Sequence, residues 1–267
     1  MSSAIPNCGL DRARYSKNLP MQRLDKELVK LGFFPSREKA KVAILAGYVR
    51  VSGRSNCKPG DIIKPTDVIE VLNQEKYVSR GGYKLERALD YYQIDVTGMT
   101  ALDIGASTGG FTDCLLQRGA AKVYAIDVGK GQLAWKLRND PRVIVMEGIN
   151  ARYLNRSHFP PTFKEANIAV IDCSFISLKL IIPTSIQLLG EKSKIVALIK
   201  PQFEAGKKEA DIHKGVIKDP LIHQRVIADL ENFVKSNSKL LWRGVIESPI
   251  KGQSGNKEFL VYLEKLT

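Results

Sequence analysis

One stretch, residues 100–127, constrains the fold of this chain more than any other. It begins with a short apolar run at 101–104, which is typical of a buried parallel strand. A helical pattern at 111–118 comes after a glycine-rich turn that contains Gly105, Gly109 and Gly110. Glycines between a strand and a helix let the backbone approach a ligand closely and leave N–H groups free at the helix N-terminus. The stretch therefore predicts a strand–turn–helix unit that binds a ligand.

A second predicted strand, 122–126, ends in Asp127, a little over twenty positions after Asp103. An acidic residue at this point of a βαβ unit accepts hydrogen bonds from ribose hydroxyls, which predicts a nucleoside cofactor. The glycines lack the spacing of the strict dinucleotide fingerprint. An ordinary doubly wound fold with an incidental glycine turn is the alternative.

The D-x-G-x-x-x-G-G-F run that starts at Asp103 resembles motif I of the methyltransferases that use S-adenosylmethionine (SAM). That resemblance implies SAM as the cofactor. We expect it to be bound by residues of the turn and of the following strand ends: Gly105, Ser107, Gly109, Gly110, Phe111, Asp127, Val128, Asn150 and Asp172.

The chain of 267 residues is long enough for one large domain and one small one. Its formal net charge is +13. Such a surplus attracts polyanions, so nucleic acid is the expected partner, and a merely solvated basic surface is the alternative.

The cysteines and histidines show no ligand spacing, so we expect no metal site. Four unpatterned cysteines and the absence of a leader predict reduced thiols in a cytoplasmic protein: Cys8, Cys57, Cys114 and Cys173. The longest apolar stretch, 168–189, is interrupted by charges and a proline, so we expect no membrane span.

Residues 1–20 are polar and aperiodic, which predicts a flexible arm. Residues 21–75 form a small predicted domain. Its first helix has leucines at helical spacing, and Ser36 is positioned to cap a second helix with Val42, Ile44 and Leu45 facing inward. Strands are predicted at 48–51 and 68–71.

This small domain closely resembles the S4 RNA-binding domain, through its helix caps, its G-Y-V-R-V-S-G segment and its K-P-G-D turn. The resemblance implies that Arg23, Arg37 and Lys41 contact RNA phosphates. Each of these cations is otherwise an ordinary solvated helix position.

Residues 76–82 contain paired glycines after a polar run and are predicted to be a linker. From 83 to 267 strands and helices alternate, and two last strands are predicted to form an antiparallel pair. The predicted fold class is therefore α/β: a small α+β domain, then a doubly wound, Rossmann-like sheet with an antiparallel strand at one edge.

Three charged residues follow or begin predicted strands in the larger domain: Asp172, Lys200 and Glu258. The carboxyl ends of parallel strands are where ligands bind in such sheets, so these side chains are expected at the cofactor crevice. Lys84, on the first helix of the domain, can join them if that helix crosses the crevice. A structural ion-pair cluster is the alternative.

Five motifs from residue 79 onward resemble the TlyA/haemolysin A family: SRGGYKL at 79–85, DVGKGQL at 127–133, DCSFISL at 172–178, KPQFE at 200–204 and GNKE at 255–258. These are S4-plus-FtsJ-type methyltransferases, and the resemblance covers almost everything after residue 20. It implies 2′-O-methylation of ribosomal RNA with SAM, and a catalytic tetrad of Lys84, Asp172, Lys200 and Glu258.

Two points stay open at this stage. Lys200 is either the proton acceptor or an electrostatic stabiliser of the alkoxide. The polar stretch 202–218 is predicted to be a long loop at the mouth of the crevice, and it is either an RNA clamp or lid or a disordered insertion without a role. The competing functions are a non-catalytic RNA-binding protein with a vestigial cofactor fold and, as the family's other name suggests, a cytolysin.

Overall fold

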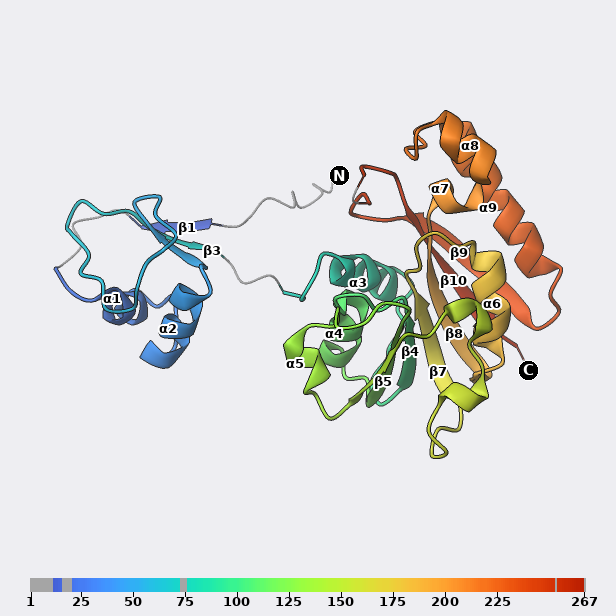
Figure 1. Cartoon of the computed structure of the whole chain (residues 1–267), viewed down its shortest axis with the longest axis horizontal. Helices are drawn as coiled ribbons and strands as arrows, with labels where there is room; N and C mark the ends of the chain where they lie inside the picture. The colour runs from blue at the N-terminus through green and yellow to red at the C-terminus, as the bar shows by residue number, and fades with distance from the viewer. Residues whose placement is uncertain (1–11, 16–20, 73–75, 253, 267) are drawn as a thin grey trace. The chain divides into compact units, whose positions relative to one another are not determined.

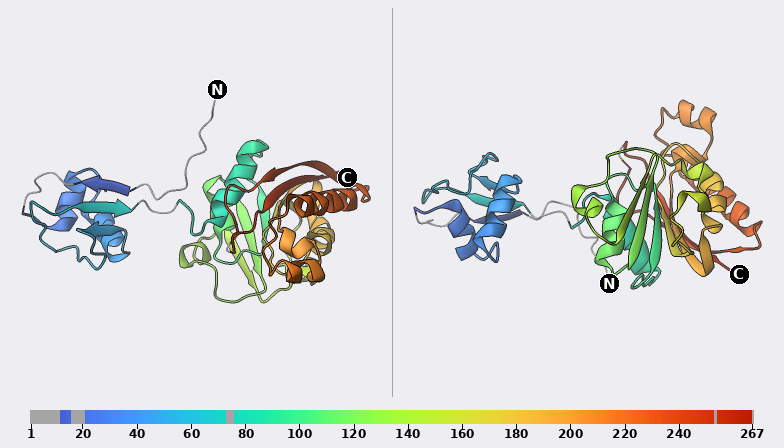
Figure 2. Two further views of the ribbon diagram at one scale, coloured as in Figure 1. Left: turned by 90° about the horizontal axis from the view of Figure 1, so that it is seen from above. Right: turned by 60° about the horizontal axis from the view of Figure 1, so that its bottom comes forward.

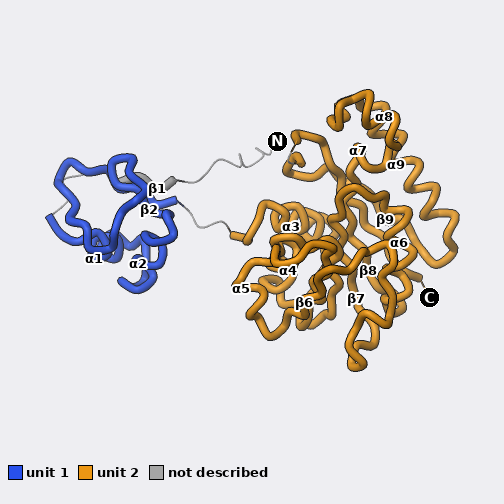
Figure 3. Tube along the Cα trace, in the orientation of Figure 1, with its two compact units in different colours: residues 1–75 blue, residues 76–267 orange. Residues whose placement is uncertain are grey.

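The computed structural model describes residues 12–15, 21–72, 76–252 and 254–266. The chain divides into two compact units, Met1–Glu75 and Lys76–Thr267 (Figure 3). We call them the N-terminal unit and the C-terminal unit, and each is described by itself.

The N-terminal unit has two helices and a three-stranded antiparallel sheet of order β1-β3-β2. Its elements are β1 (Arg12–Tyr15), α1 (Leu24–Lys30), α2 (Arg37–Leu45), β2 (Val49–Val51) and β3 (Ile69–Leu72). Residues 12–15, expected to belong to a flexible arm, instead pair with β3 as an edge strand. The rest of that predicted arm lies outside the described residues.

Helix α2 begins where the sequence predicts, because the Ser36 side chain accepts a hydrogen bond from the Lys39 backbone N–H. The prediction of which α2 side chains are buried is only partly confirmed. Ile44 is buried, but Val42 and Leu45 are 61% and 73% exposed. Ala40 and Ala43 lie on the buried stripe with Ile44, and positions 42 and 45 form a separate stripe at helical spacing.

The C-terminal unit contains a seven-stranded sheet of order β6-β5-β4-β7-β8-β10-β9 (Figure 1). The strands are β4 (Thr100–Ile104), β5 (Lys122–Asp127), β6 (Val143–Glu147), β7 (Ala166–Ile171), β8 (Leu189–Ile199), β9 (Leu240–Glu247) and β10 (Phe259–Lys265). The first five in spatial order are parallel, and β10 runs antiparallel to both of its neighbours. The predicted α/β class is confirmed, and the reversed strand is inserted between β8 and β9 rather than at the edge.

Helices cover both faces of this sheet, as the two views of Figure 2 show. One face packs on α3 (Gly81–Tyr91), α4 (Gly110–Gln117) and the residues around α5 (Trp135–Arg138). The other face packs on α6 (Leu178–Ile186) and α9 (Pro220–Lys235). Short 3-10 turns, η1 (Ala151–Tyr153) and η2 (Arg156–His158), follow β6.

The stretch 202–218, expected as a long loop, contains two short helices, α7 (Pro201–Glu204) and α8 (Lys207–Ile212). Asn256 joins this segment to the last hairpin. Its buried side chain accepts from the Ile217 N–H at 2.9 Å and donates to the Gly215 carbonyl at 2.8 Å. The segment is therefore a structured part of the C-terminal unit.

The predicted linker at 76–82 also belongs to the C-terminal unit. Tyr77 is 1% exposed and packs in the core beside α3 and α4. Gly81 and Gly82 are the first residues of α3, and a Cβ on Gly110 would lie 2.9 Å from the Gly82 nitrogen. A Cβ on Gly82 would overlap the Tyr77 side chain, so Gly82 leaves room for that residue, and Gly110 permits the two helix N-termini to pack closely. These are different reasons for glycine than a hinge.

Candidate active site

The glycine turn after β4 packs closely against residues of other segments. Gly105 has φ +89°, and a Cβ there would stand 2.6 Å from the Asp172 carbonyl oxygen. Gly109 has φ +98°, and its Cβ would overlap the side chains of Leu133 and Leu137. Both positions need glycine for conformation and for space.

Asp127 lies at the end of β5 with its carboxylate held by two backbone groups. Oδ2 accepts from the Ser107 N–H and Oδ1 accepts from the Gly129 N–H, both at 2.7 Å. Each carboxylate oxygen has a second lone pair, so the group can still accept hydrogen bonds from a ligand.

A cavity of about 460 Å³ opens beside this carboxylate. Most of the residues expected to bind a cofactor line it: Gly105, Ser107, Asp127, Val128, Asn150 and Asp172. Ile149 and Ile176 add apolar surface. A cavity with an apolar wall and a fixed carboxylate acceptor is of the kind that can hold an adenosine group. Gly109 lines neither this cavity nor the next one, since it faces Leu133 and Leu137.

A second cavity, of about 420 Å³, shares Gly105, Ser107 and Asp172 with the first. Gly110, Phe111 and all four residues of the expected tetrad line it. The tetrad forms two ion pairs. Lys84 Nζ donates to Glu258 Oε2 at 2.6 Å, and Lys200 Nζ lies 2.6 Å from Asp172 Oδ1. The four side chains come from three different parts of the unit: α3, the carboxyl ends of β7 and β8, and the start of β10.

These ion pairs are shielded from water. The lysine side chains are 12% and 10% exposed for Lys84 and Lys200, and the Glu258 side chain is 3% exposed. Lys200 Nζ also donates to Ser174 Oγ at 3.0 Å. A Cβ on Gly252 would collide with the Glu258 carboxylate, so the loop before β10 closes over this group. Charges in such a site interact more strongly than in water.

Several groups that line the second cavity were not predicted. Phe175 is 88% exposed at φ +64°, which is unusual for an aromatic residue, and its ring lies 4.9 Å from the Phe203 ring, centroid to centroid. Arg80 and Gln202 also line the cavity. The sequence signal for these residues was their place in the motifs that also contain Lys84, Asp172 and Lys200.

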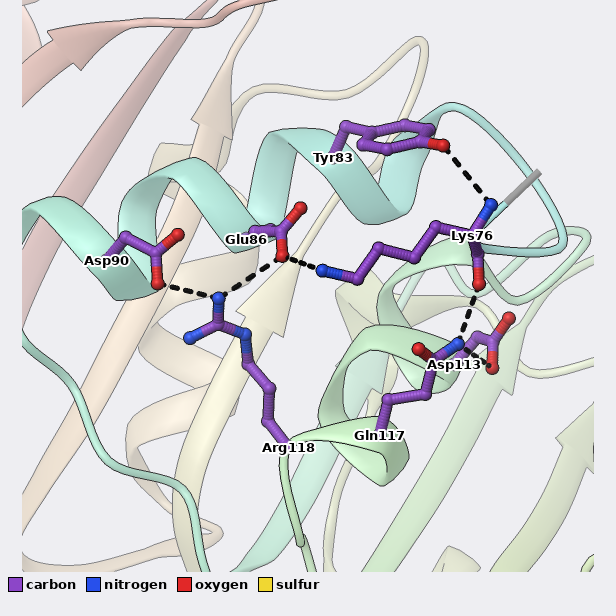
Figure 4. Close-up of polar contacts among 7 residues, drawn as sticks. All are labelled: Lys76, Tyr83, Glu86, Asp90, Asp113, Gln117 and Arg118. Atoms are coloured by element: carbon purple, nitrogen blue, oxygen red, sulfur yellow. Dashed lines mark hydrogen bonds and ion pairs between the residues drawn. The ribbon is translucent and has the colours of Figure 1, made fainter. Parts of the chain in front are cut away.

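The segment that leads into α3 is fixed by a polar network on the surface of α3 and α4 (Figure 4). Gln117 Nε2 donates to the Lys76 carbonyl at 2.8 Å, and the Val78 N–H donates to Asp113 Oδ2 at 2.8 Å. Arg118 bridges two carboxylates on α3, those of Glu86 and Asp90. These contacts hold the start of α3, and with it Lys84, against α4.

The three residues expected to contact RNA lie on the N-terminal unit. Arg23 and Arg37 both donate to the buried carboxylate of Asp25, at 3.1 Å and 2.8 Å. Their side chains remain 42% exposed, so outward N–H groups are free to meet a phosphate. Lys41 lies one turn further along α2 and is partly exposed. RNA contact by these three residues stays a prediction.

The described part of the chain contains no cluster of metal ligands and no membrane-spanning helix. No group of three or more His, Cys, Asp or Glu residues there could hold a metal ion. No helix among the described residues is long and apolar enough to cross a membrane.

Comparisons with known proteins agree with this geometry. A family model described as FtsJ-like methyltransferase matches residues 77–265, and the S4 domain model matches residues 22–69. The chain therefore belongs to the FtsJ-like methyltransferases, and among them to the TlyA/haemolysin A family, in which an S4 domain precedes the methyltransferase domain.

Relatives are similar over nearly their whole length. The 16S/23S rRNA (cytidine-2′-O)-methyltransferase TlyA of Mycobacterium tuberculosis is 42% identical, over 92% of this chain and 90% of its own. Hemolysin A of Brachyspira hyodysenteriae is 44% identical, over 90% and 98%. A solved structure from Streptococcus thermophilus, provisionally named a hemolysin, is 44% identical with a TM-score of 0.69, over 92% of this chain and 89% of its own.

Proposed function

We propose that this protein is a cytoplasmic, SAM-dependent methyltransferase that modifies ribose 2′-hydroxyls of ribosomal RNA. The observation that carries the proposal is the presence of two shielded lysine–carboxylate pairs on the walls of one cavity, next to a cavity with a fixed ribose acceptor. The names of the relatives support ribosomal RNA as the substrate. The net charge of +13 suits a polyanionic partner.

The residues around the first cavity fit SAM. Asp127 would accept from its ribose hydroxyls, and Val128, Ile149 and Ile176 would contact the adenine. When bound, SAM supplies a methyl group that is electrophilic because it is attached to a sulfonium. The chain itself must align the hydroxyl and remove its proton.

Lys84 and Lys200 lie in the same cavity, each with its own carboxylate. A lysine can stabilise the alkoxide that develops on a ribose oxygen, or, when neutral, accept its proton. We assign Lys200 to the hydroxyl proton and Lys84 to the position of the 2′-oxygen. Asp172 and Glu258 orient these two amines and limit their motion.

The ring pair of Phe175, which is exposed, and Phe203, which is partly buried, also fits a nucleotide substrate. Aromatic rings at the edge of a site stack on nucleobases of any sequence. In this proposal the rings hold a base near the cavity, the two lysines act on the ribose, and the N-terminal unit binds RNA elsewhere through Arg23, Arg37 and Lys41.

Two measurements test the proposal. SAM binding to the purified protein is measured by calorimetry, and 2′-O-methyl sites are mapped in ribosomal RNA from cells with and without the protein. We expect binding, and a methylated ribose that disappears with the gene. RNA binding without SAM binding would indicate the non-catalytic alternative. Lysis of erythrocytes by purified protein that neither binds SAM nor methylates RNA would indicate the cytolysin.

A further inference from the structure

Asp103, in the middle of the sheet on β4, is a buried carboxyl for which the reaction described above has no use. It has no exposed surface. Thr112 Oγ1 donates to its Oδ2 at 2.6 Å, and Oδ1 has no hydrogen-bond partner among the described residues. An ionised carboxylate in such a place is costly unless a cation or several donors accompany it.

The elements packed around Asp103 supply no cation. In register on the neighbouring strands lie Ala125 of β5 and Val170 of β7. The hydroxyl of Thr112 comes from α4. Helix α3 contributes only glycine and apolar residues to the core on this face: Gly82, Leu85, Ala88 and Leu89.

The charged groups within electrostatic reach are themselves acidic. Asp127 ends β5 and Asp172 follows β7, so both lie at the ends of the strands that flank β4. Lys200 is engaged with Asp172. The thiol of Cys173 is also in reach, but burial raises its pKa to about 12, so it stays protonated near neutral pH. Burial, reinforced by Asp172 and Asp127, raises the pKa of Asp103 to about 7, although the Thr112 hydrogen bond opposes the shift.

Asp127 and Asp172 line the cofactor cavity, and Asp103 lies two residues before Gly105, which also lines it. Of these three carboxyl groups, only that of Asp172 forms an ion pair with a lysine among the described residues. We propose that Asp103 senses the charge of the methyl donor: near neutral pH its carboxyl is protonated in part of the free protein molecules, and it releases this proton to solvent when a cation enters the adjoining cavity. This inference rests on the proposed function, because the cation is the sulfonium of SAM. Only a proton moves, and no bond to carbon changes.

The coupling has a consequence for turnover. Ionised Asp103 attracts a sulfonium through space, and S-adenosylhomocysteine, the product, has a neutral sulfur. Proton release therefore favours the donor over the product and helps the product to leave. A carboxyl that only stabilises the fold through Thr112 would give no such preference.

Calorimetry on the full chain tests the proposal directly. SAM binding at pH 7 is measured in phosphate and in Tris, whose ionisation enthalpies differ greatly. We expect the enthalpies to differ by an amount equivalent to release of about half a proton per site, since the carboxyl is about half ionised at its own pKa. Asp103→Asn should abolish this difference.

The pH profile supplies the second readout. SAM affinity should rise between pH 6 and pH 8, by about tenfold for each unit by which bound SAM lowers the pKa of Asp103. S-adenosylhomocysteine should show a flatter profile. Thr112→Val keeps the shape of the side chain and removes the donor, so it should move the SAM profile to higher pH, which a structural role alone would not do.

The outcomes separate the two proposals. SAM binding with equal enthalpies in both buffers and a flat pH profile would overturn the role of Asp103 and leave the proposed function intact. No SAM binding at any pH would overturn both. If Asp103→Asn does not fold, an unshifted profile in Thr112→Val decides against the proposal.

Discussion

Asp25 in the N-terminal unit and Asp103 in the C-terminal unit are both fully buried, yet their surroundings are opposite. Asp25 accepts hydrogen bonds from Arg23 and Arg37, chiefly Arg23, and these hold its pKa well below the usual range. Asp103 has one hydroxyl donor and acidic neighbours, and its pKa rises to about 7.

The difference separates two uses of a buried acid. Asp25 is permanently ionised at neutral pH and fixes two guanidinium groups at the surface, where their remaining donors can meet phosphate. Asp103 is close to its titration point, so a charge that arrives nearby can change its state. The lysine–carboxylate pairs of the cavity differ from both, because each acid there has a lysine partner and lines a cavity that a substrate can enter.

The largest effect is expected where a paired charge acts on the substrate. Lys200→Ala should lower single-turnover methyl transfer by ~10²–10⁴-fold, the usual contribution of general acid–base help, with SAM affinity near normal. Asp172→Ala should reduce both the rate of methyl transfer and the affinity for SAM, since Asp172 lines both cavities. The measurement is transfer of labelled methyl groups to ribosomal RNA under single-turnover conditions.

Arginine at the same position distinguishes the two roles of Lys200. It retains the positive charge but cannot accept a proton. A Lys200→Arg variant with most of its activity would rule out proton abstraction and favour alkoxide stabilisation. Full activity in Lys200→Ala would contradict the tetrad itself.

The next largest effect is the pH dependence that Asp103 gives to the unfolding free energy of the C-terminal unit. Because its folded-state pKa is raised, the carboxyl favours the folded state below the unfolded pKa of roughly 4, and this advantage is lost as pH rises through about 7. Asp103→Asn should therefore stabilise the C-terminal unit by about 2–4 kcal/mol more at pH 8 than at pH 4. Urea unfolding at the two pH values measures this. An equal effect at both would show that Asp103 does not titrate differently on folding.

The sequence predicted the parts of the site that depend on local rules. Asp127, Asp172 and Lys200 each follow an apolar run, and the carboxyl ends of parallel strands meet at one edge of a sheet whatever the rest of the fold. Glu258 was expected at the crevice because it begins a predicted strand, and Lys84 only on the condition that its helix crosses the crevice. No periodicity indicates that α3 and β10 reach the same cavity, so the pairing of these two side chains was not predicted.

What the sequence could not predict depends on contacts distant along the chain. Gly109 seemed to make room for a cofactor, but its neighbours are Leu133 and Leu137. The pair at Gly81 and Gly82 was interpreted as a hinge, yet Gly82 leaves room for the buried side chain of Tyr77. The place of β10 between β8 and β9 depends on the order of strands in space, which alternation along the chain does not determine.

A smaller effect, on RNA affinity, is expected in the N-terminal unit, where Arg23 and Arg37 both form ion pairs with Asp25. Lys41→Ala should weaken RNA binding and reduce the slope of log affinity against log salt by about 0.7–0.9, the value for one lost phosphate contact. Arg37→Ala should do the same and also lower the unfolding midpoint of this unit, because Asp25 loses a partner. Filter binding of a ribosomal RNA fragment at several salt concentrations measures the slopes. Equal stability of the two variants would contradict the structural part assigned to Arg37.

The smallest effect is expected where paired charges are exposed, in the network of Figure 4. Arg118 lies 2.6 Å from Asp90 and 3.3 Å from Glu86, but the Asp90 side chain is 56% exposed. Water and salt screen such pairs, so Arg118→Ala should cost only about 0.5 kcal/mol of unfolding free energy, and less at 1 M salt. Gln117→Ala is the matched control, because it removes uncharged donors to Lys76 and Asp113 on the same surface and its cost should not depend on salt. A loss above about 2 kcal/mol in Arg118→Ala that persists at high salt would contradict this prediction. It would mean that the Arg118 ion pairs stabilise the fold as strongly as buried pairs do, in spite of their exposure.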